Sequence, residues 1–185
     1  MSIVAVDLAA KFSAAVWMDD NRKVFHQCDS WQSTETWFID TITQPWRYAT
    51  APPDALVIED LPPRVPWMTV VKDVCRLQGR IAERMMQYGW REAMLFVQPA
   101  VWRGHYGEDL KQGTGPNAVL PVAEQHGYHW PSDLKDRAVG RGTKATANKV
   151  ATDYCAAYLI GRWALDYFDE HGTFDAPRTS RYGAT

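Results

Sequence analysis

Short apolar runs separated by turn-forming residues open the chain. Residues 3–8 and 14–18 are rich in β-branched and small apolar side chains, and the polar sequence Asp19-Asp20-Asn21 follows the second run. This pattern predicts two strands and a turn, with a third strand over residues 22–28. Connections this short exclude the crossover that parallel strands need, so we expect the first three strands to pair antiparallel.

Strands and helices alternate after this opening. The apolar periodicity predicts further strands over residues 55–59 and 94–97, and helices over residues 34–43, 118–126 and about 145–168. Ser33 is a suitable N-cap for the first helix, and the glycine-rich residues 102–117 predict a loop. This order predicts an α/β fold with a mixed five-stranded sheet and helices on both faces.

The segment over residues 68–88 has the pattern of an amphipathic helix. Its apolar residues recur at steps of three and four: Val70, Val74, Leu77, Ile81 and Met85. On a neighbouring face four basic residues recur at steps of four, and we call them the basic stripe: Lys72, Arg76, Arg80 and Arg84. Gly79 lies inside this helix, where glycine costs about 1 kcal/mol relative to alanine. We therefore expect a close contact at Gly79, within the molecule or with a partner.

Length and composition fit one compact, soluble domain. The chain has 185 residues, of which 46% are hydrophobic, and no apolar run approaches the roughly 18 residues of a membrane span. The first residues lack the basic region of an export signal, so we expect a cytoplasmic protein. Three cysteines at wide spacing (Cys28, Cys75 and Cys155) predict reduced thiols. Residues 173–185 predict a loosely ordered tail.

Charge alone does not identify a nucleic-acid binder. There are 20 basic and 22 acidic residues, for a net charge of −2. Basic residues gather within residues 64–103, which include the basic stripe, and within residues 135–149. These two regions are candidate phosphate-facing surfaces, and an ordinary solvated face is the alternative interpretation.

Three acidic residues stand where apolar residues are expected. Asp7 ends the first strand, Glu59 ends the fourth and is followed by Asp60, and Asp153 lies in the apolar part of the last helix. A carboxylate on a surface meant for burial is costly unless it is paired or bound to a metal. If the first and fourth strands are neighbours, Asp7 and Glu59 emerge side by side and repel each other. A divalent cation with oxygen ligands resolves this conflict, so the pattern predicts a Mg²⁺ or Mn²⁺ site. The alternative is that each acid is an ordinary strand-end or helix-start residue.

Several segments, taken in order, resemble a known family. They are Ile3-Val4-Ala5-Val6-Asp7-Leu8-Ala9, Val57-Ile58-Glu59, Arg76-Leu77-Gln78-Gly79-Arg80-Ile81, the segment from Val97 to Gly104 and the helix around Asp153. Together they are similar to RuvC-type Holliday junction resolvases of the RNase H-like superfamily, in particular a phage-type member. The resemblance covers about residues 3–165. It implies a single RNase H-like nuclease domain over residues 1–172.

The resemblance implies a metal-dependent endonuclease that cleaves branched DNA in recombination and repair. Asp7, Glu59 and Asp153 would be the catalytic residues and would hold two Mg²⁺ or Mn²⁺ ions. The family's last helix carries a further ligand three residues before Asp153, where this chain has Val150. Asp60 or Asp136 could replace it, or three carboxylates could suffice. Ala9 also stands where the family has glycine.

The implied partners are four-way DNA junctions and a second copy of the chain. DNA contacts are expected from the basic stripe and from the second basic region: Lys135, Arg137, Arg141, Lys144 and Lys149. The family's central helices form a dimer interface, which would explain Gly79 as a contact point. Trp67, Trp102 and Tyr106, expected in loops, could stack on splayed bases. If the gene is phage-borne, the location is the bacterial host cytoplasm.

Two other functions are compatible with the same residues. One is an RNase H-like nuclease that acts on flaps, single strands or RNA-containing substrates, because a metal site reads the phosphate rather than the base. The other is a non-catalytic nucleic-acid binding module, which the missing ligand at Val150 suggests. A sugar-kinase-like phosphotransferase is excluded, because it requires a duplicated domain and roughly twice this length.

Overall fold

The computed structural model describes residues 1–9, 12–19, 22–27, 30–43, 53–61, 68–90, 93–107, 110, 116–128 and 144–173. Its strands are β1 (Ile3–Asp7), β2 (Phe12–Trp17), β3 (Lys23–Gln27), β4 (Ala55–Glu59) and β5 (Met94–Val97). Its helices are α1 (Trp31–Phe38), η1 (Ile39–Thr43), α3 (Met68–Gln87), α4 (Pro99–His105), α6 (Pro116–Gln125) and α8 (Lys144–His171). Of the predicted tail, only Thr173 is among the described residues.

The strands form one mixed sheet in the order β3-β2-β1-β4-β5. β1 pairs antiparallel with β2, and β2 with β3, as the short connections predicted. β4 pairs parallel with both β1 and β5. The mixed α/β architecture is therefore confirmed, and β1 and β4 lie next to each other near the centre of the sheet.

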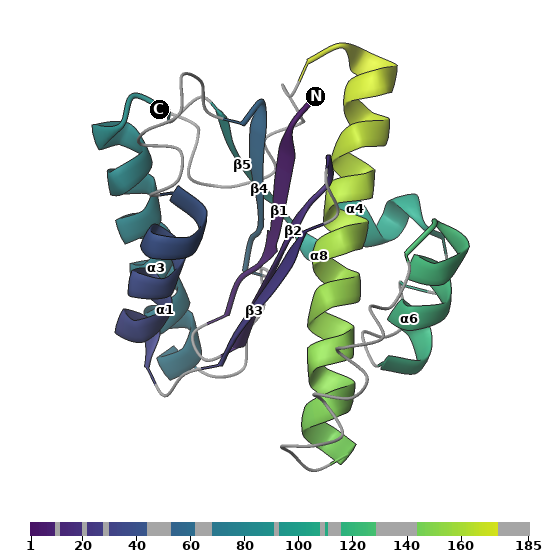
Figure 1. Ribbon diagram of the computed structural model, residues 1–185, viewed down its shortest axis with the longest axis horizontal. Helices are drawn as coiled ribbons and strands as arrows, with labels where there is room; N and C mark the ends of the chain where they lie inside the picture. Colours follow the sequence, from purple (N-terminus) through teal and green to yellow (C-terminus); the bar gives the residue numbers. More distant parts are fainter. Residues whose placement is uncertain are drawn as a thin grey trace.

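Helices cover both faces of the sheet (Figure 1). One layer contains α1 and α3, and the other contains α4, α6 and α8. Side chains alternate between the two layers because successive residues of a strand point to opposite faces. Ile3, Ala5 and Val57 pack with α8, whereas Val4 and Ile58 pack with α3. Each strand thus contributes to two separate cores.

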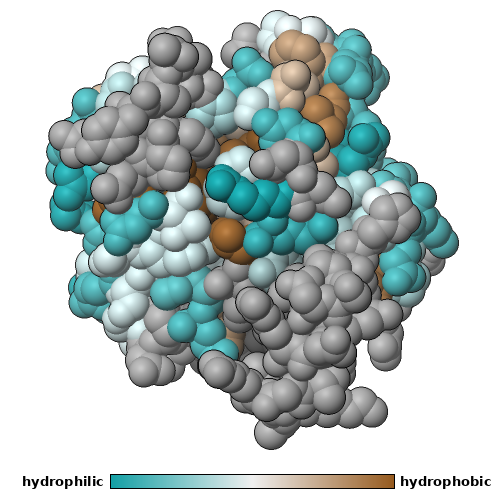
Figure 2. Space-filling model, in the orientation of Figure 1, coloured by the Kyte–Doolittle hydropathy of each residue, from teal (hydrophilic) through white to brown (hydrophobic). Residues whose placement is uncertain are grey.

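The predicted amphipathic helix over residues 68–88 is present as α3. Val74, Leu77, Ile81 and Met85 are buried against the sheet, as their spacing predicted. On the face shown in Figure 2, hydrophilic residues cover most of the described surface and hydrophobic ones show in small, separate areas. Within the described ranges, no helix is long and apolar enough to cross a membrane.

The first helix and the segment after β5 differ most from the predicted bounds. The first helix begins three residues earlier than expected, because the N-cap is Ser30, whose hydroxyl oxygen accepts a hydrogen bond from the Ser33 N–H at 3.3 Å. Residues 99–105 form the short helix α4, although residues from 102 onward were predicted as loop. Pro99 at its first turn and the buried Trp102 stabilise this helix despite Gly104.

The close contact predicted at Gly79 is absent within the described part of the molecule. A methyl group added at Gly79 would meet no atom within 4 Å. The close approach occurs instead at Gly161, where α8 crosses the sheet. A methyl group there would overlap the Met18 side chain and lie 3.1 Å from the Ala5 Cβ. Gly161 therefore sets how closely α8 approaches β1, and so where α8 places its side chains relative to that strand.

We expect Gly79→Ala and Gly161→Ala to have different effects on stability. Both changes gain about 1 kcal/mol of helix propensity, but only Gly161→Ala also overpacks a core, which typically costs about 1–3 kcal/mol. The free energy of unfolding, measured in urea, should therefore rise above the wild-type value for Gly79→Ala. The value for Gly161→Ala should be lower than the value for Gly79→Ala by about the overpacking cost. Equal values for the two variants would contradict the close approach at Gly161.

Candidate active site

Asp7 and Glu59 meet at the carboxyl edge of the sheet. The register pairs Val6 with Ile58, which brings the next residues of β1 and β4 side by side. Side chains two residues apart along a strand point to the same face of the sheet. Asp7 therefore lies on the same face as Ile3 and Ala5, and Glu59 on the same face as Ala55 and Val57. This is the face that α8 covers. The two carboxyl groups share a hydrogen bond. This hydrogen bond is one of the influences that oppose the rise in the pKa of Glu59.

Asp153 approaches the same point from α8. The residue is 5% exposed and belongs to α8, the helix that packs on β1, β2 and β4. The negative charge of Asp153 contributes to raising the pKa of Glu59, as expected for a neighbouring carboxylate. The structure thus brings together the three acids that the sequence predicted. Their role as metal ligands stays a prediction.

Helix α4 supplies two donors to Glu59. The Trp102 indole Nε1 donates to Glu59 Oε1 at 3.0 Å, and the Arg103 guanidinium Nη2 donates to the same oxygen at 3.2 Å. Trp102 is completely buried. The prediction that Trp102 lies in a loop and stacks on bases was therefore wrong. Trp67 lies outside the described residues, and Tyr106 donates its hydroxyl to the Leu159 carbonyl at 2.7 Å.

Burial is the main influence on the ionisation of Glu59. The side chain is 16% exposed, and desolvation raises its pKa above the usual value. The neighbouring charge of Asp153 raises the pKa further, while Arg103, Trp102 and the hydrogen bond with Asp7 oppose this effect. Among the described residues, the Arg103 guanidinium lies beside these carboxyl groups, at Glu59. A bound cation would offset the negative charge of ionised carboxylates at this edge.

The donor set fits a hard divalent cation. Mg²⁺ and Mn²⁺ prefer carboxylate oxygens, and the described acids at this edge offer only such oxygens. Within the described ranges, however, no three acidic, histidine or cysteine side chains already surround one point as metal ligands.

Asp60 points away from this cluster. Because it directly follows Glu59, its side chain points to the opposite face of the sheet, toward α3. There its Oδ1 accepts hydrogen bonds from the Leu61 N–H at 2.7 Å and from Gln78 Nε2 at 3.4 Å. This geometry does not support Asp60 as the additional ligand. Asp136 lies outside the described residues. Val150 belongs to α8, but its side chain is also outside the description.

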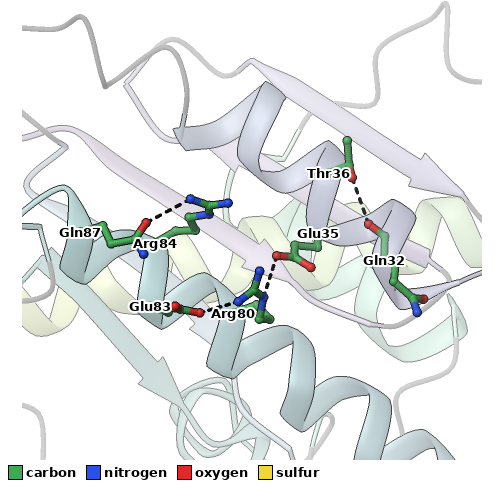
Figure 3. Close-up of polar contacts among 7 residues, drawn as sticks. All are labelled: Gln32, Glu35, Thr36, Arg80, Glu83, Arg84 and Gln87. Carbon is green, nitrogen blue, oxygen red and sulfur yellow. Dashed lines mark hydrogen bonds and ion pairs between the residues drawn. The ribbon is translucent and has the colours of Figure 1, made fainter.

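The basic stripe lies on α3, in the layer opposite the acids. Figure 3 shows Arg80 between two acids, with Nε 3.1 Å from Glu35 Oε1 of α1 and Nη1 2.7 Å from Glu83 Oε2 of α3. Arg84 donates to Gln87 Oε1 at 3.0 Å. Arg80 therefore ties α1 to α3, and its charge is already balanced within the protein.

The first half of α3 approaches the carboxyl edge of the sheet. Gln78 Nε2 donates to the Glu59 carbonyl at 3.4 Å, whereas Met85 belongs to the core cluster against which Met94, at the start of β5, packs. Because Lys72 and Arg76 precede Gln78, they lie on the part of α3 nearest the acids. Lys72 is exposed, and Arg76 is 61% exposed with only a 3.6 Å contact to Asp73. These two residues are the members of the stripe best placed to meet a ligand at the acidic edge.

The second basic region is only partly described. Lys135, Arg137 and Arg141 lie outside the described residues. Lys144 and Lys149 belong to the first turns of α8, and Lys149 lies about one turn before Asp153. Their backbone positions are thus at the acidic end of α8, and their contacts with DNA stay a prediction.

Trp102 and Arg103 are the site residues that sequence reasoning missed as partners of Glu59. A signal was available, because β5 is parallel to β4 and the residues after parallel strands meet at the same edge of a sheet. His105, which falls in the segment predicted as a glycine-rich loop, belongs to α4 and contacts Asp166 of α8 at 3.2 Å. Of the cysteines, Cys75 and Cys155 are free thiols, and Cys28 is outside the described residues.

The fold is shared with solved Holliday junction resolvases. Thermus thermophilus RuvC, solved in complex with a Holliday junction substrate, superposes with a TM-score of 0.59 at 8% identity, covering 92% of this chain and 97% of that chain. The yeast mitochondrial Holliday junction resolvase gives a TM-score of 0.56 at 12% identity, covering 87% of this chain and 78% of that chain. No protein-family model and no curated protein match the sequence. These comparisons show that the chain has the RuvC fold.

We expect Glu59→Gln to stabilise the protein at neutral pH when no metal is present. Glutamine can keep both bonds from α4 and carries no charge. The raised pKa of Glu59 means that the folded state holds this proton more tightly than the unfolded state, so wild-type stability falls as the pH rises above the ordinary glutamate pKa. A gain of about 1 kcal/mol would raise Tm by about 2–4 °C in a chain of this size.

Thermal unfolding with a chelator, at several pH values, measures this effect. The advantage of Glu59→Gln should shrink as the pH falls and the wild-type carboxyl group takes up its proton. Glu170→Gln is the matched control, because Glu170 is 79% exposed near the far end of α8. A wild type that is more stable than Glu59→Gln at neutral pH would mean that the ion pair with Arg103 outweighs the cost of burial.

Proposed function

We propose that this protein is a metal-dependent endonuclease that cleaves branched DNA, acting as a Holliday junction resolvase. The observation that carries this proposal is the meeting of Asp7, Glu59 and Asp153 at one edge of the sheet. The fold shared with two solved Holliday junction resolvases supports the choice of substrate. The acids account for the chemistry, and the fold comparison supports four-way DNA junctions.

Asp7, Glu59 and Asp153 would hold two Mg²⁺ or Mn²⁺ ions. When bound, these ions would activate a water molecule for attack on the phosphodiester and stabilise the leaving 3′ oxygen. The protein's part is to fix the carboxylates in place. β1 and β4 present two of them from a rigid sheet, and Gly161 lets α8 approach closely enough to present the third.

DNA would meet the protein along its acidic edge. Lys72 and Arg76 lie at this edge from the α3 side, and Lys144 and Lys149 belong to the α8 turns at the same end. Positive charge on both sides of the acids would hold the phosphate backbone across them. Arg103, whose side chain is 26% exposed, adds a positive charge beside Glu59. Lys135, Arg137 and Arg141 are proposed contacts that precede α8 in the chain.

A homodimer fits the cleavage of two symmetric strands. An isologous pair would present one site to each strand of a four-way junction. Gly79 supports α3 as the contact surface, because it is exposed and the space beside it is open. Met86, 56% exposed, is an apolar residue on the same helix. We also propose that residues 1–172 act as a single nuclease domain in the cytoplasm.

The substrate is tested by cleavage assays on a four-way junction, a flap, a duplex and an RNA–DNA hybrid with Mg²⁺ or Mn²⁺. We expect the junction to be cut most efficiently. A preference for flaps, single strands or hybrids would retain the nuclease chemistry and remove the resolvase assignment. Junction binding without cleavage under any metal condition would favour a non-catalytic binding module.

The catalytic acids are tested by removing one charge at a time. Asp7→Asn, Glu59→Gln and Asp153→Asn should each reduce cleavage to background and retain junction binding, because each loses a metal ligand without losing a DNA contact. Gel-shift and cleavage assays on the same preparations separate the two effects. Asp169→Asn, on the exposed end of α8, is the control that should keep both activities. Parallel loss of binding and cleavage would instead indicate a structural role.

Arg76 and Arg80 should differ in their contribution to DNA binding. Arg76→Ala should weaken junction binding and reduce the slope of log affinity against log salt by about 1, as expected for one lost phosphate contact. Arg80→Ala should leave this slope unchanged, because Arg80 is held by Glu35 and Glu83. Binding titrations at several salt concentrations, with sedimentation at each step, measure both. If Arg76→Ala changes self-association and not the salt slope, the stripe belongs to the dimer interface.

A further inference from the structure

Trp102 satisfies its buried indole N–H with a partner from the acidic cluster. The side chain is completely buried among apolar residues that include Val97 and Leu110. Its indole Nε1 donates to Glu59 Oε1 at 3.0 Å. An indole has one donor and no acceptor, so this bond uses all of its hydrogen-bonding capacity.

We propose that Trp102 is a positioning residue that holds the carboxylate of Glu59 in the orientation needed to bind a metal ion. This inference rests on the proposed function. A ligand carboxylate is commonly oriented by hydrogen bonds from residues behind it, and loss of such a partner typically lowers metal affinity by about 10- to 100-fold. Trp102 acts through Glu59 and has no contact of its own with the substrate.

The rigidity of its surroundings suits Trp102 to this role. α4 begins at Pro99, two residues after β5 ends, so its first turn is anchored to the sheet beside β4. Val97 pairs with Glu59 across the sheet. The indole and the carboxylate are therefore both attached to the same rigid framework. Close packing around the ring prevents it from turning away when the charge at the site changes.

Both donors from α4 use the same oxygen of Glu59. Trp102 and Arg103 each donate to Oε1, and the Arg103 guanidinium lies 5.0 Å from the centroid of the Trp102 ring. A cation bound through Oε2 would leave both hydrogen bonds intact.

Metal binding to the chelator-treated protein, measured by calorimetry with Mn²⁺ alone, tests this role. Trp102→Phe keeps an aromatic ring and removes the N–H. Trp163→Phe is the matched control, because Trp163 is 4% exposed in the same core and comes from α8. We expect Trp102→Phe to weaken Mn²⁺ binding by about 10- to 100-fold, and Trp163→Phe to leave it unchanged at a similar loss of stability in urea. Equal Mn²⁺ affinity in the two variants would overturn the proposal.

A second measurement uses the wild-type protein and does not depend on the variant folding. The ¹⁵N-labelled indole of Trp102 should remain protected from hydrogen exchange when diamagnetic Mg²⁺ is added, because the bond to Oε1 persists in the loaded site. Loss of protection on loading would show that the bond breaks, and would overturn the positioning role.

Asp7→Asn separates failure of this inference from failure of the proposed function. If Asp7→Asn abolishes Mn²⁺ binding and Trp102→Phe behaves like Trp163→Phe, the metal site stands and only the role of Trp102 is wrong. If Asp7→Asn binds Mn²⁺ as the wild type does, the ions are not held by these acids, and the proposed site itself is wrong.

Discussion

The parallel pairing of β1 with β4 is the constraint on which the rest of the site depends. It places Asp7 and Glu59 side by side on the face of the sheet that α8 covers, where two carboxylates would repel each other at low dielectric. Two donors from α4 bind the Glu59 carboxylate and oppose this repulsion. Asp153 adds a third carboxyl group rather than relieving the first two. Clustering carboxyl groups in this way raises the electrostatic free energy of the protein alone, and a bound cation would lower it.

The buried carboxyl groups lower the stability of the folded state, and they lie in a part of the fold that neighbouring strands and helices hold in place. β1 and β4 are flanked by strands on both sides, and each is buried by helices on both faces. Such a framework can hold buried charge in place without local unfolding, whereas a loop could not. This is the usual relation between stability and activity, in which a functional site reduces the stability that the surrounding packing supplies.

The two helical layers have different chemistry. On the α8 side, the strands and helices present carboxyl groups, an indole and a guanidinium at the sheet edge. On the α3 side, the contacts described at the surface are ion pairs such as Arg80 with Glu35, which join helices to each other (Figure 3). The alternation of side chains along each strand produces this separation. Glu59 and Asp60 are adjacent in sequence, yet the first faces the acids and the second faces Gln78.

Local pattern was enough to predict much of the fold. The bounds of β4 and β5 and the buried face of α3 follow from apolar runs and helical spacing, because burial acts on each segment directly. α4 was missed because a seven-residue helix containing Gly104 has too few turns to show periodicity. The cap at Ser30 was misplaced because Ser33 offered the same side-chain chemistry nearby.

The sequence by itself determined which acids interrupt apolar elements, and hence that Asp7, Glu59 and Asp153 needed a common explanation. Only the tertiary structure decided that Asp60 faces away, that Arg80 is held between Glu35 and Glu83, and that Trp102 is a partner of Glu59. The physical reason is the separation along the sequence over which each effect acts. Burial and periodicity act between residues close in the chain. These contacts instead join segments that are far apart in sequence and are brought together by strand order and helix packing.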